Sequence, residues 1–201
     1  MAFIPATTMV RRRTDKMTYL RAVEPVLPTT ACVAWPHGMP PSLITLGELG
    51  FVLVDSPSND TIVHYAAQLT ACGGKVWVRC CEEPSFDEAS AAAHGLEVHE
   101  CVFPDGTPPS PALIERWLAL CARRDGPVAV QCVAGLGRAP VLAAIAFMEA
   151  GLPATEAISL IRRHRRGALN RKQTAWLLDE YTPTGALRKV CGGATGCGPG
   201  A

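Results

Sequence analysis

One stretch decides the fold of this 201-residue chain: VAVQCVAGLGRAP, residues 128–140. Its first residues are mostly apolar and β-branched or small, which favours a short buried strand that ends at Cys132. A loop with two glycines follows. Arg138 then opens a segment that is apolar almost all round as far as Met148, which is typical of a central helix. The stretch therefore predicts a strand, a tight loop and a buried helix.

Strands and helices alternate along the rest of the chain as well. Short apolar runs bounded by turn residues predict strands over residues 51–54, 75–80, 96–102 and 127–132, with a further strand near 17–21. Helical periodicity predicts helices over residues 59–71, 111–121, 153–166 and 170–181, with Ser58 or Asn59 capping the first and Ser110 the second. This order predicts an α/β fold, in which helices cover both faces of a central, mostly parallel sheet of about five strands.

The two ends of the chain differ from its middle. Residues 1–16 are predicted to form a flexible N-terminal tail, and the glycine-rich residues 186–201 a disordered C-terminal one. Length favours a single domain between them, over residues 17–185.

Charge is unevenly distributed, although the formal net charge is only +1. Residues 41–120 carry three basic and eleven acidic side chains, whereas residues 162–189 carry eight basic and two acidic ones. The near balance argues against a chain that coats nucleic acid. Two interpretations of the basic segment 162–172 stay open: a solvated helix face, and weak contact with an anionic membrane or an acidic protein.

The nine cysteines do not suggest a disulfide or zinc framework. Their odd number argues against a secreted, fully paired protein, and the lack of any Cys-x-x-Cys pair argues against structural zinc. The N-terminus does not resemble a signal peptide, and the longest apolar stretch is half the length of a membrane span. Cys197 lies one residue too early for a prenylation box. We therefore expect a cytoplasmic protein with reduced thiols, at most peripheral at the inner membrane face.

The loop between Cys132 and Arg138 has the chemistry of an anion site. Backbone amides of such a loop can converge on one anion, and the start of a helix adds positive potential. The same field favours the thiolate form of Cys132, and the planar Arg138 guanidinium matches two phosphate oxygens. This Cys–Arg spacing with Gly at both 135 and 137 is expected by chance only roughly 0.005 times in such a composition. The pattern predicts thiol-based phosphoryl transfer.

The stretch CVAGLGRAPVL, which begins at Cys132, resembles the signature loop of the phosphatases of regenerating liver. These are the type IVA protein tyrosine phosphatases, within the dual-specificity cysteine phosphatases. Other segments resemble the same family: residues 51–54 with 57–61, VRCCE at 78–82, DGTPP at 105–109 and RRHRRGALN at 162–170. The resemblance covers roughly residues 17 to 190 and implies a tyrosine phosphatase-like domain with an apparent insertion at 22–48.

The resemblance implies a role for each site residue. Cys132 would be the nucleophile, Arg138 the phosphate clamp and Asp105 the general acid. Cys81 aligns with the family's cysteine that forms a reversible disulfide with the nucleophile; Cys80 is the alternative, and alternation along a strand lets only one of them face the pocket. The phosphate would lie in a cradle of backbone amides from Val133, Ala134, Gly135, Leu136, Gly137 and Arg138.

Partners and cofactors follow from the same resemblance. It implies phosphotyrosine protein substrates and no metal or organic cofactor. Relatives also dock CBS-pair magnesium transporters through this pocket, which makes a low-turnover binding module the alternative function. A sulfurtransferase or arsenate-reductase-like thiol enzyme is a third hypothesis, which the proline-rich loop after Asp105 disfavours.

Three departures from the family pattern predict a slow enzyme. Gln131 stands where most relatives have a histidine, and Phe103 and Pro104 replace the tryptophan-containing start of the acid loop. Ala139 lacks the hydroxyl with which most tyrosine phosphatases help the thiolate to leave when the phosphocysteine is hydrolysed. Alanine at that position is itself a feature of the resembled family.

Overall fold

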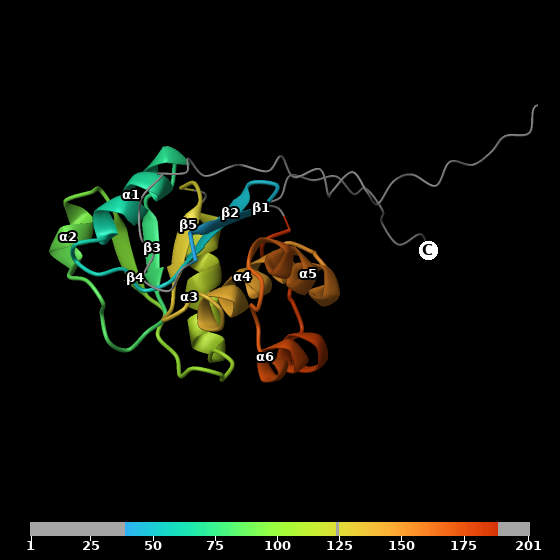
Figure 1. Ribbon diagram of the computed structural model, residues 1–201. Helices are drawn as coiled ribbons and strands as arrows, with labels where there is room; N and C mark the ends of the chain where they lie inside the picture. The colour runs from blue at the N-terminus through green and yellow to red at the C-terminus, as the bar shows by residue number, and fades with distance from the viewer. Residues whose placement is uncertain (1–38, 124, 189–201) are drawn as a thin grey trace, which may run out of the picture.

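The strand that precedes Cys132 is β5 (Val128–Gln131), and it lies at the centre of the sheet. The structure, a computed structural model, describes residues 39–123 and 125–188. Within these residues five strands follow the order β1-β2-β5-β3-β4 (Figure 1). The other four are β1 (Ser42–Leu46), β2 (Leu49–Val54), β3 (Val76–Arg79) and β4 (Glu97–Glu100). β1 is antiparallel to β2 and the remaining pairs are parallel, which confirms the predicted mostly parallel sheet.

Helices cover both faces of this sheet, as Figure 1 shows. α1 (Ile62–Ala71) and α2 (Glu88–Ala92) contribute to an apolar cluster around Trp77 on one face. The larger cluster on the other face contains α3 (Pro111–Ala122), α4 (Arg138–Glu149) and α5 (Ala154–His164). α6 (Arg171–Ala175) continues directly into a π-helical turn, η2 (Trp176–Glu180). The predicted α/β architecture is confirmed.

The helix α4 is the central helix that the opening stretch predicts. All of its residues are buried, and all except Arg138 and Glu149 are apolar. The Trp117 indole N–H of α3 donates to the carbonyl of Leu142 at 2.8 Å. The Phe147 ring packs edge-on against Phe51 of β2, with ring centroids 5.2 Å apart. These contacts hold the middle and the end of α4 against α3 and β2.

The strand β1 lies inside the predicted insertion at 22–48, where no strand was expected. It pairs with β2 along its full length, from Ser42 opposite Leu53 to Leu46 opposite Leu49. Its side chains contribute to both apolar clusters, Leu43 to one and Ile44 to the other. A five-residue strand that is covered on both faces lacks the clean alternation that would identify it.

Helix starts agree with prediction at one site and differ at another. α3 begins as expected, with the Ser110 hydroxyl accepting from the Leu113 N–H at 3.3 Å. α1 begins later than predicted, at Ile62, and capping by Ser58 or Asn59 is wrong. The Asn59 side chain instead accepts from the backbone N–H of Asp87 at 2.8 Å, just before α2. The sequence does not predict α2, because its five residues are too few to show helical periodicity.

Two terminal predictions fall beyond the structural description. The strand near 17–21 and the tail over 1–16 lie outside the described residues. At the other end, packed chain continues past the predicted domain boundary at 185. Leu187 is buried, and its N–H donates to the carbonyl of Glu149 at 3.2 Å.

The carboxylate of Glu149, at the end of α4, ties this C-terminal segment to the core. It accepts hydrogen bonds from the Tyr181 hydroxyl at 2.6 Å and from the Ala186 N–H at 2.8 Å. It also accepts from the Thr184 N–H at 3.0 Å and the Thr184 hydroxyl at 2.8 Å. Burial of Glu149 acts to raise its pKa, but these hydrogen bonds outweigh burial, so the pKa lies below its ordinary value.

We expect Glu149→Gln to lower the free energy of unfolding by about 2 kcal/mol at neutral pH, because an amide donor would face backbone donors. A depressed carboxyl pKa stabilises the fold above the unfolded-state pKa of about 4.3, and this stabilisation is lost as the pH falls through the folded-state value. Urea unfolding between pH 7 and pH 3 should therefore show that the free energy of unfolding falls more steeply with decreasing pH in the wild type than in Glu149→Gln. Equal pH dependences of the two free energies would contradict this account.

Candidate functional site

The predicted nucleophile and clamp lie at the carboxyl edge of the central strands. Cys132 is the first residue after β5, and its N–H donates to the carbonyl of Val54 at the end of β2, at 3.4 Å. The next hydrogen bond runs from the Ser56 N–H to the carbonyl of Val133 at 3.2 Å. Arg138, six residues after Cys132, opens α4. Parallel strands bring such loops together at one edge, which is where ligands bind in sheets of this kind.

The loop 133–138 wraps tightly over a buried arginine. Gly135 has a φ of +67°, and a Cβ there would lie 2.3 Å from Nη2 of Arg165 and 2.7 Å from the carbonyl oxygen of Val54. Any side chain at position 135 would therefore disrupt the loop. Val133 lies on the outer side of this loop, and 51% of its surface is exposed.

Arg165 holds the loop from beneath. Its Nε donates to the carbonyl of Gly135 at 2.8 Å and its Nη2 to that of Ala134 at 3.2 Å. In a trans peptide the N–H points opposite to the C=O, so the amides of Gly135 and Leu136 are directed away from Arg165, toward the predicted phosphate position. Nη1 of Arg165 donates to the carbonyls of Pro40 and Leu53 and to the hydroxyl of Ser42, at 3.0, 3.1 and 3.3 Å.

The basic segment 162–172 is consequently not one solvated face. Arg165 is fully buried, and Arg162 donates to the carbonyls of Ala168 and Leu169 at 3.0 and 2.9 Å. Five basic residues are exposed: Arg162, Arg163, Arg166, Arg171 and Lys172. Within residues 39–123 and 125–188, no helix has the length and apolar character to cross a membrane.

Arg138 is buried and oriented by backbone carbonyls. Its Nη1 donates to the carbonyl oxygens of Cys80 and Phe103 at 3.2 and 3.3 Å. Its Nε is buried without a hydrogen-bond partner, 3.6 Å from Oδ1 of Asp105. A buried donor without an acceptor costs about 1–3 kcal/mol, so this atom suits an incoming anion.

Asp105 is exposed and lies on a loop that local hydrogen bonds fold. Its carboxylate accepts from the Gly106 N–H at 3.0 Å, and its side chain is 73% exposed. A Cβ on Gly137 would lie 3.2 Å from Oδ1 of Asp105 and equally far from Nε2 of Gln173. The structure thus brings Asp105 to the end of the loop that joins Cys132 to Arg138.

Gln173 is a site residue that the sequence did not identify. Its backbone N–H and its Oε1 form a capping box with Asn170 at the start of α6. Its Nε2 is buried without a hydrogen-bond partner and lies beside Gly137. The sequence Asn-x-x-Gln does signal a capping box, but nothing in it shows that the amide would reach the cradle loop.

Gln131, which replaces the family's histidine, has a fully occupied side chain. Its Oε1 accepts from the Trp77 indole N–H at 2.9 Å, and its Nε2 donates to the hydroxyls of Ser56 and Ser85, each at 3.1 Å. The Ser56 hydroxyl in turn donates to the carbonyl of Cys132 at 3.4 Å. Gln131 therefore supports the loops around Cys132 from the face that α1 and α2 cover.

Two thiols lie near Cys132. Burial raises the pKa of both Cys80 and Cys81, and the proximity of Cys132 adds to both shifts. Arg138 and hydrogen bonds with the Ser56 side chain and the Val133 backbone oppose the shift at Cys81. Cys81 is therefore close to the backbone of Val133, and both thiols are buried, Cys80 completely. Across the described ranges, no cluster of three or more His, Cys, Asp and Glu side chains could hold a metal ion.

Known proteins resemble this chain in sequence and in fold. The chain is 38% identical to the PRL-1 phosphatase of Drosophila melanogaster over 162 residues, which cover 78% of this chain and 91% of the relative. It is 38% identical to human protein tyrosine phosphatase type IVA 3 over 153 residues, 74% of this chain and 87% of the relative. A solved Leishmania major protein tyrosine phosphatase matches with a TM-score of 0.64 and 33% identity, over 72% of this chain and all 100% of its own. No protein-family model matches the chain.

Proposed function

Since this chain belongs to the PRL, or type IVA, family of protein tyrosine phosphatases, we propose that it hydrolyses phosphotyrosine in proteins through a phosphocysteine on Cys132. One observation carries the proposal. The loop after Cys132 has its carbonyls bonded to buried Arg165, while Nε of Arg138 remains without a partner at its end. Amides and guanidinium are thus both available to one anion next to the thiol.

The first step transfers the phosphoryl group to sulfur. The Cys132 thiolate attacks phosphorus, the bond from phosphorus to the tyrosyl oxygen breaks, and Asp105 gives its proton to the leaving phenolate. That proton matters because a phenol of pKa about 10 leaves poorly as an anion. Arg138 and the loop amides hold the equatorial oxygens, where charge accumulates.

The second step returns the enzyme to its starting state. Water attacks phosphorus, the S–P bond breaks, and the Asp105 carboxylate takes the proton from water. The products are inorganic phosphate and the Cys132 thiolate. Ala139 is buried directly after Arg138 and offers no hydroxyl to the departing sulfur, which supports slow hydrolysis of the intermediate.

The test is direct detection of the intermediate. A phosphotyrosine peptide is mixed with the full chain, the reaction is quenched in acid, and the tryptic peptide that contains Cys132 is examined for one added phosphoryl group. We expect the adduct in the wild type and its absence in Cys132→Ser, while Cys72→Ser, which changes a thiol at the end of α1, keeps it. No adduct and no phosphate release, in either the wild type or Ala139→Ser, would exclude the enzyme.

Docking of an acidic partner loop is the second candidate function. Its supporting observation is that a carboxylate already lies near the arginine, since Oδ1 of Asp105 is 3.6 Å from Nε of Arg138. A CBS-pair magnesium transporter is the partner that the family resemblance suggests. Binding that survives Cys132→Ser and is lost in Arg138→Ala, in a protein that forms no phosphocysteine, would favour docking over catalysis.

Redox control is a further prediction for the same cysteine. One equivalent of peroxide would oxidise Cys132 to the sulfenic acid, and the Cys81 thiol would displace water to form the disulfide. Because Cys81 is close to the backbone of Val133, we expect mild peroxide to give a Cys81–Cys132 linked peptide, reversible by dithiothreitol. Cys81→Ser should instead accumulate irreversibly oxidised Cys132. A Cys80–Cys132 peptide would show that the other thiol faces the nucleophile.

A further inference from the structure

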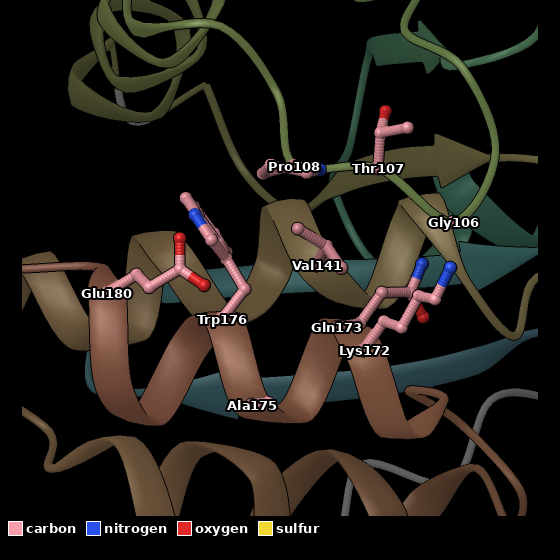
Figure 2. Close-up of a pocket in the computed structure, with 9 residues that line it drawn as sticks. All are labelled: Gly106, Thr107, Pro108, Val141, Lys172, Gln173, Ala175, Trp176 and Glu180. Carbon is pink, nitrogen blue, oxygen red and sulfur yellow. The ribbon is translucent and has the colours of Figure 1, made fainter.

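A cavity of about 360 Å³ lies beside the acid loop, between that loop, α4 and α6 with η2. Figure 2 shows Pro108 above it, Val141 at its back and Trp176 rising from the helix below. Lys172 and Gln173 lie at the end nearest Gly106, and Glu180 lies at the opposite end. The cavity therefore has apolar walls and one charged residue at each end.

The Gln173 end of the cavity opens toward the cradle. Gln173 lines the cavity, and its unpartnered Nε2 is the atom that lies beside Gly137. Gly106, another lining residue, directly follows Asp105. A substrate whose phosphate lies in the cradle would thus place the residues next to its phosphotyrosine at this opening.

The two charged residues place opposite charges at the two ends of the cavity. Lys172 and Glu180 are eight residues apart on one continuous helix, which separates them by roughly 12 Å along its axis. Among residues 39–123 and 125–188, neither forms a salt bridge. The cationic end is next to the position of the phosphate, and the anionic end is far from it.

The wall that carries Trp176 and Glu180 is a π-helical turn. The Tyr181 N–H donates to the carbonyl of Trp176 at 2.9 Å, five residues back, and the Tyr181 ring packs on Trp176 with centroids 5.2 Å apart. Such turns are rare and occur frequently at functional sites. The turn holds a large aromatic surface and a carboxylate on the same cavity.

We propose that this cavity binds the substrate chain beside the phosphotyrosine, taking an aliphatic or aromatic side chain between Pro108 and Trp176 and a basic side chain next to Glu180. The proposal rests on the proposed function, because it uses the cradle as the phosphate position. It adds a substrate class: phosphotyrosine followed or preceded by an apolar and then a basic residue. Contact with residues 106–108 would also hold the loop that carries Asp105.

The test measures binding without chemistry. Labelled phosphotyrosine peptides, with Leu or Gly beside the phosphotyrosine and Arg or Glu beyond it on either side, are titrated into the full chain carrying Cys132→Ser. On one side of the phosphotyrosine we expect Leu to bind about tenfold tighter than Gly. Arg should bind about threefold to tenfold tighter than Glu at low salt.

Variants made in the Cys132→Ser protein test whether the cavity causes these binding preferences. Glu180→Lys should invert the Arg-to-Glu preference, and Trp176→Ala should abolish the Leu-to-Gly preference. Asp179→Lys makes the same charge change at an exposed neighbour outside the cavity and should keep the wild-type ratios. Unchanged ratios in Glu180→Lys and Trp176→Ala, or no preference in the parent protein, would overturn the proposal. Phosphate release from p-nitrophenyl phosphate by the unmutated chain tests the proposed function separately.

Discussion

Arg138→Lys is expected to lower kcat/KM for a phosphotyrosine peptide by about 10³-fold, which corresponds to roughly 4 kcal/mol of transition-state stabilisation. The guanidinium is fixed by the carbonyls of Cys80 and Phe103 through one nitrogen, which leaves its other nitrogens for the phosphate. A lysine ammonium is a point charge, so it cannot satisfy two fixed carbonyls and two phosphate oxygens together.

The measurement is steady-state turnover of the peptide, with thermal unfolding of each variant to show that the fold persists. Arg163→Lys, on the exposed side of α5, is the matched control and should retain wild-type kcat/KM. If Arg138→Lys stayed within threefold of the wild type, the arginine would not be the phosphate clamp.

Arg165→Met is expected to have the second largest effect, on stability and on anion binding together. It leaves the buried carbonyls of Leu53, Ala134 and Gly135 without their donor, and each such group costs about 1–3 kcal/mol. Because some of them can reorient to water, we expect a total loss of about 3–5 kcal/mol in the free energy of unfolding. The nearby carboxylate of Asp55, which opposes the lowering of the Arg165 pKa by burial, would also lose its countercharge.

Loss of anion binding in Arg165→Met would show that Arg165 positions the loop amides and does not merely stabilise the fold. Without Arg165 the peptides after Ala134 and Gly135 are free to rotate, so the loop amides no longer converge. The Ki of orthovanadate, measured well below the melting temperature of the variant, should rise at least tenfold. Arg165→Lys should recover part of the stability but little of the vanadate affinity. Arg166→Met, at the exposed neighbouring position, is the control; a vanadate Ki equal to that of Arg166→Met would refute the positioning role.

Local sequence was sufficient for the elements that build the cradle. The run VAVQ is apolar enough to predict β5, and the segment from Arg138 is apolar on every side, so α4 could only be a buried helix. The glycines at 135 and 137 and the cysteine before them specify the loop through backbone conformation, which depends on neighbouring residues alone. The place of Cys132 and Arg138 at opposite ends of one loop follows directly.

The sequence did not predict contacts between segments that are far apart in the chain. β1 is recognised only by pairing with β2, and Gln173 only by its approach to Gly137, which is 36 residues earlier. A capping box or a short apolar run has the same local sequence pattern whatever it contacts in the folded protein. The segment that it contacts depends instead on how the sheet and the helices pack.

The basic segment shows the division between sequence and tertiary structure most clearly. The sequence by itself determined the nucleophile loop, the α/β alternation and the positive charge of residues 162–172. Only the tertiary structure decided that Arg165 turns inward, to carbonyls that lie 30 and 125 residues away in the chain, while Arg163 and Arg166 stay exposed. The reason is physical: charge is a property of the side chain, whereas burial depends on which carbonyls the fold leaves within its reach.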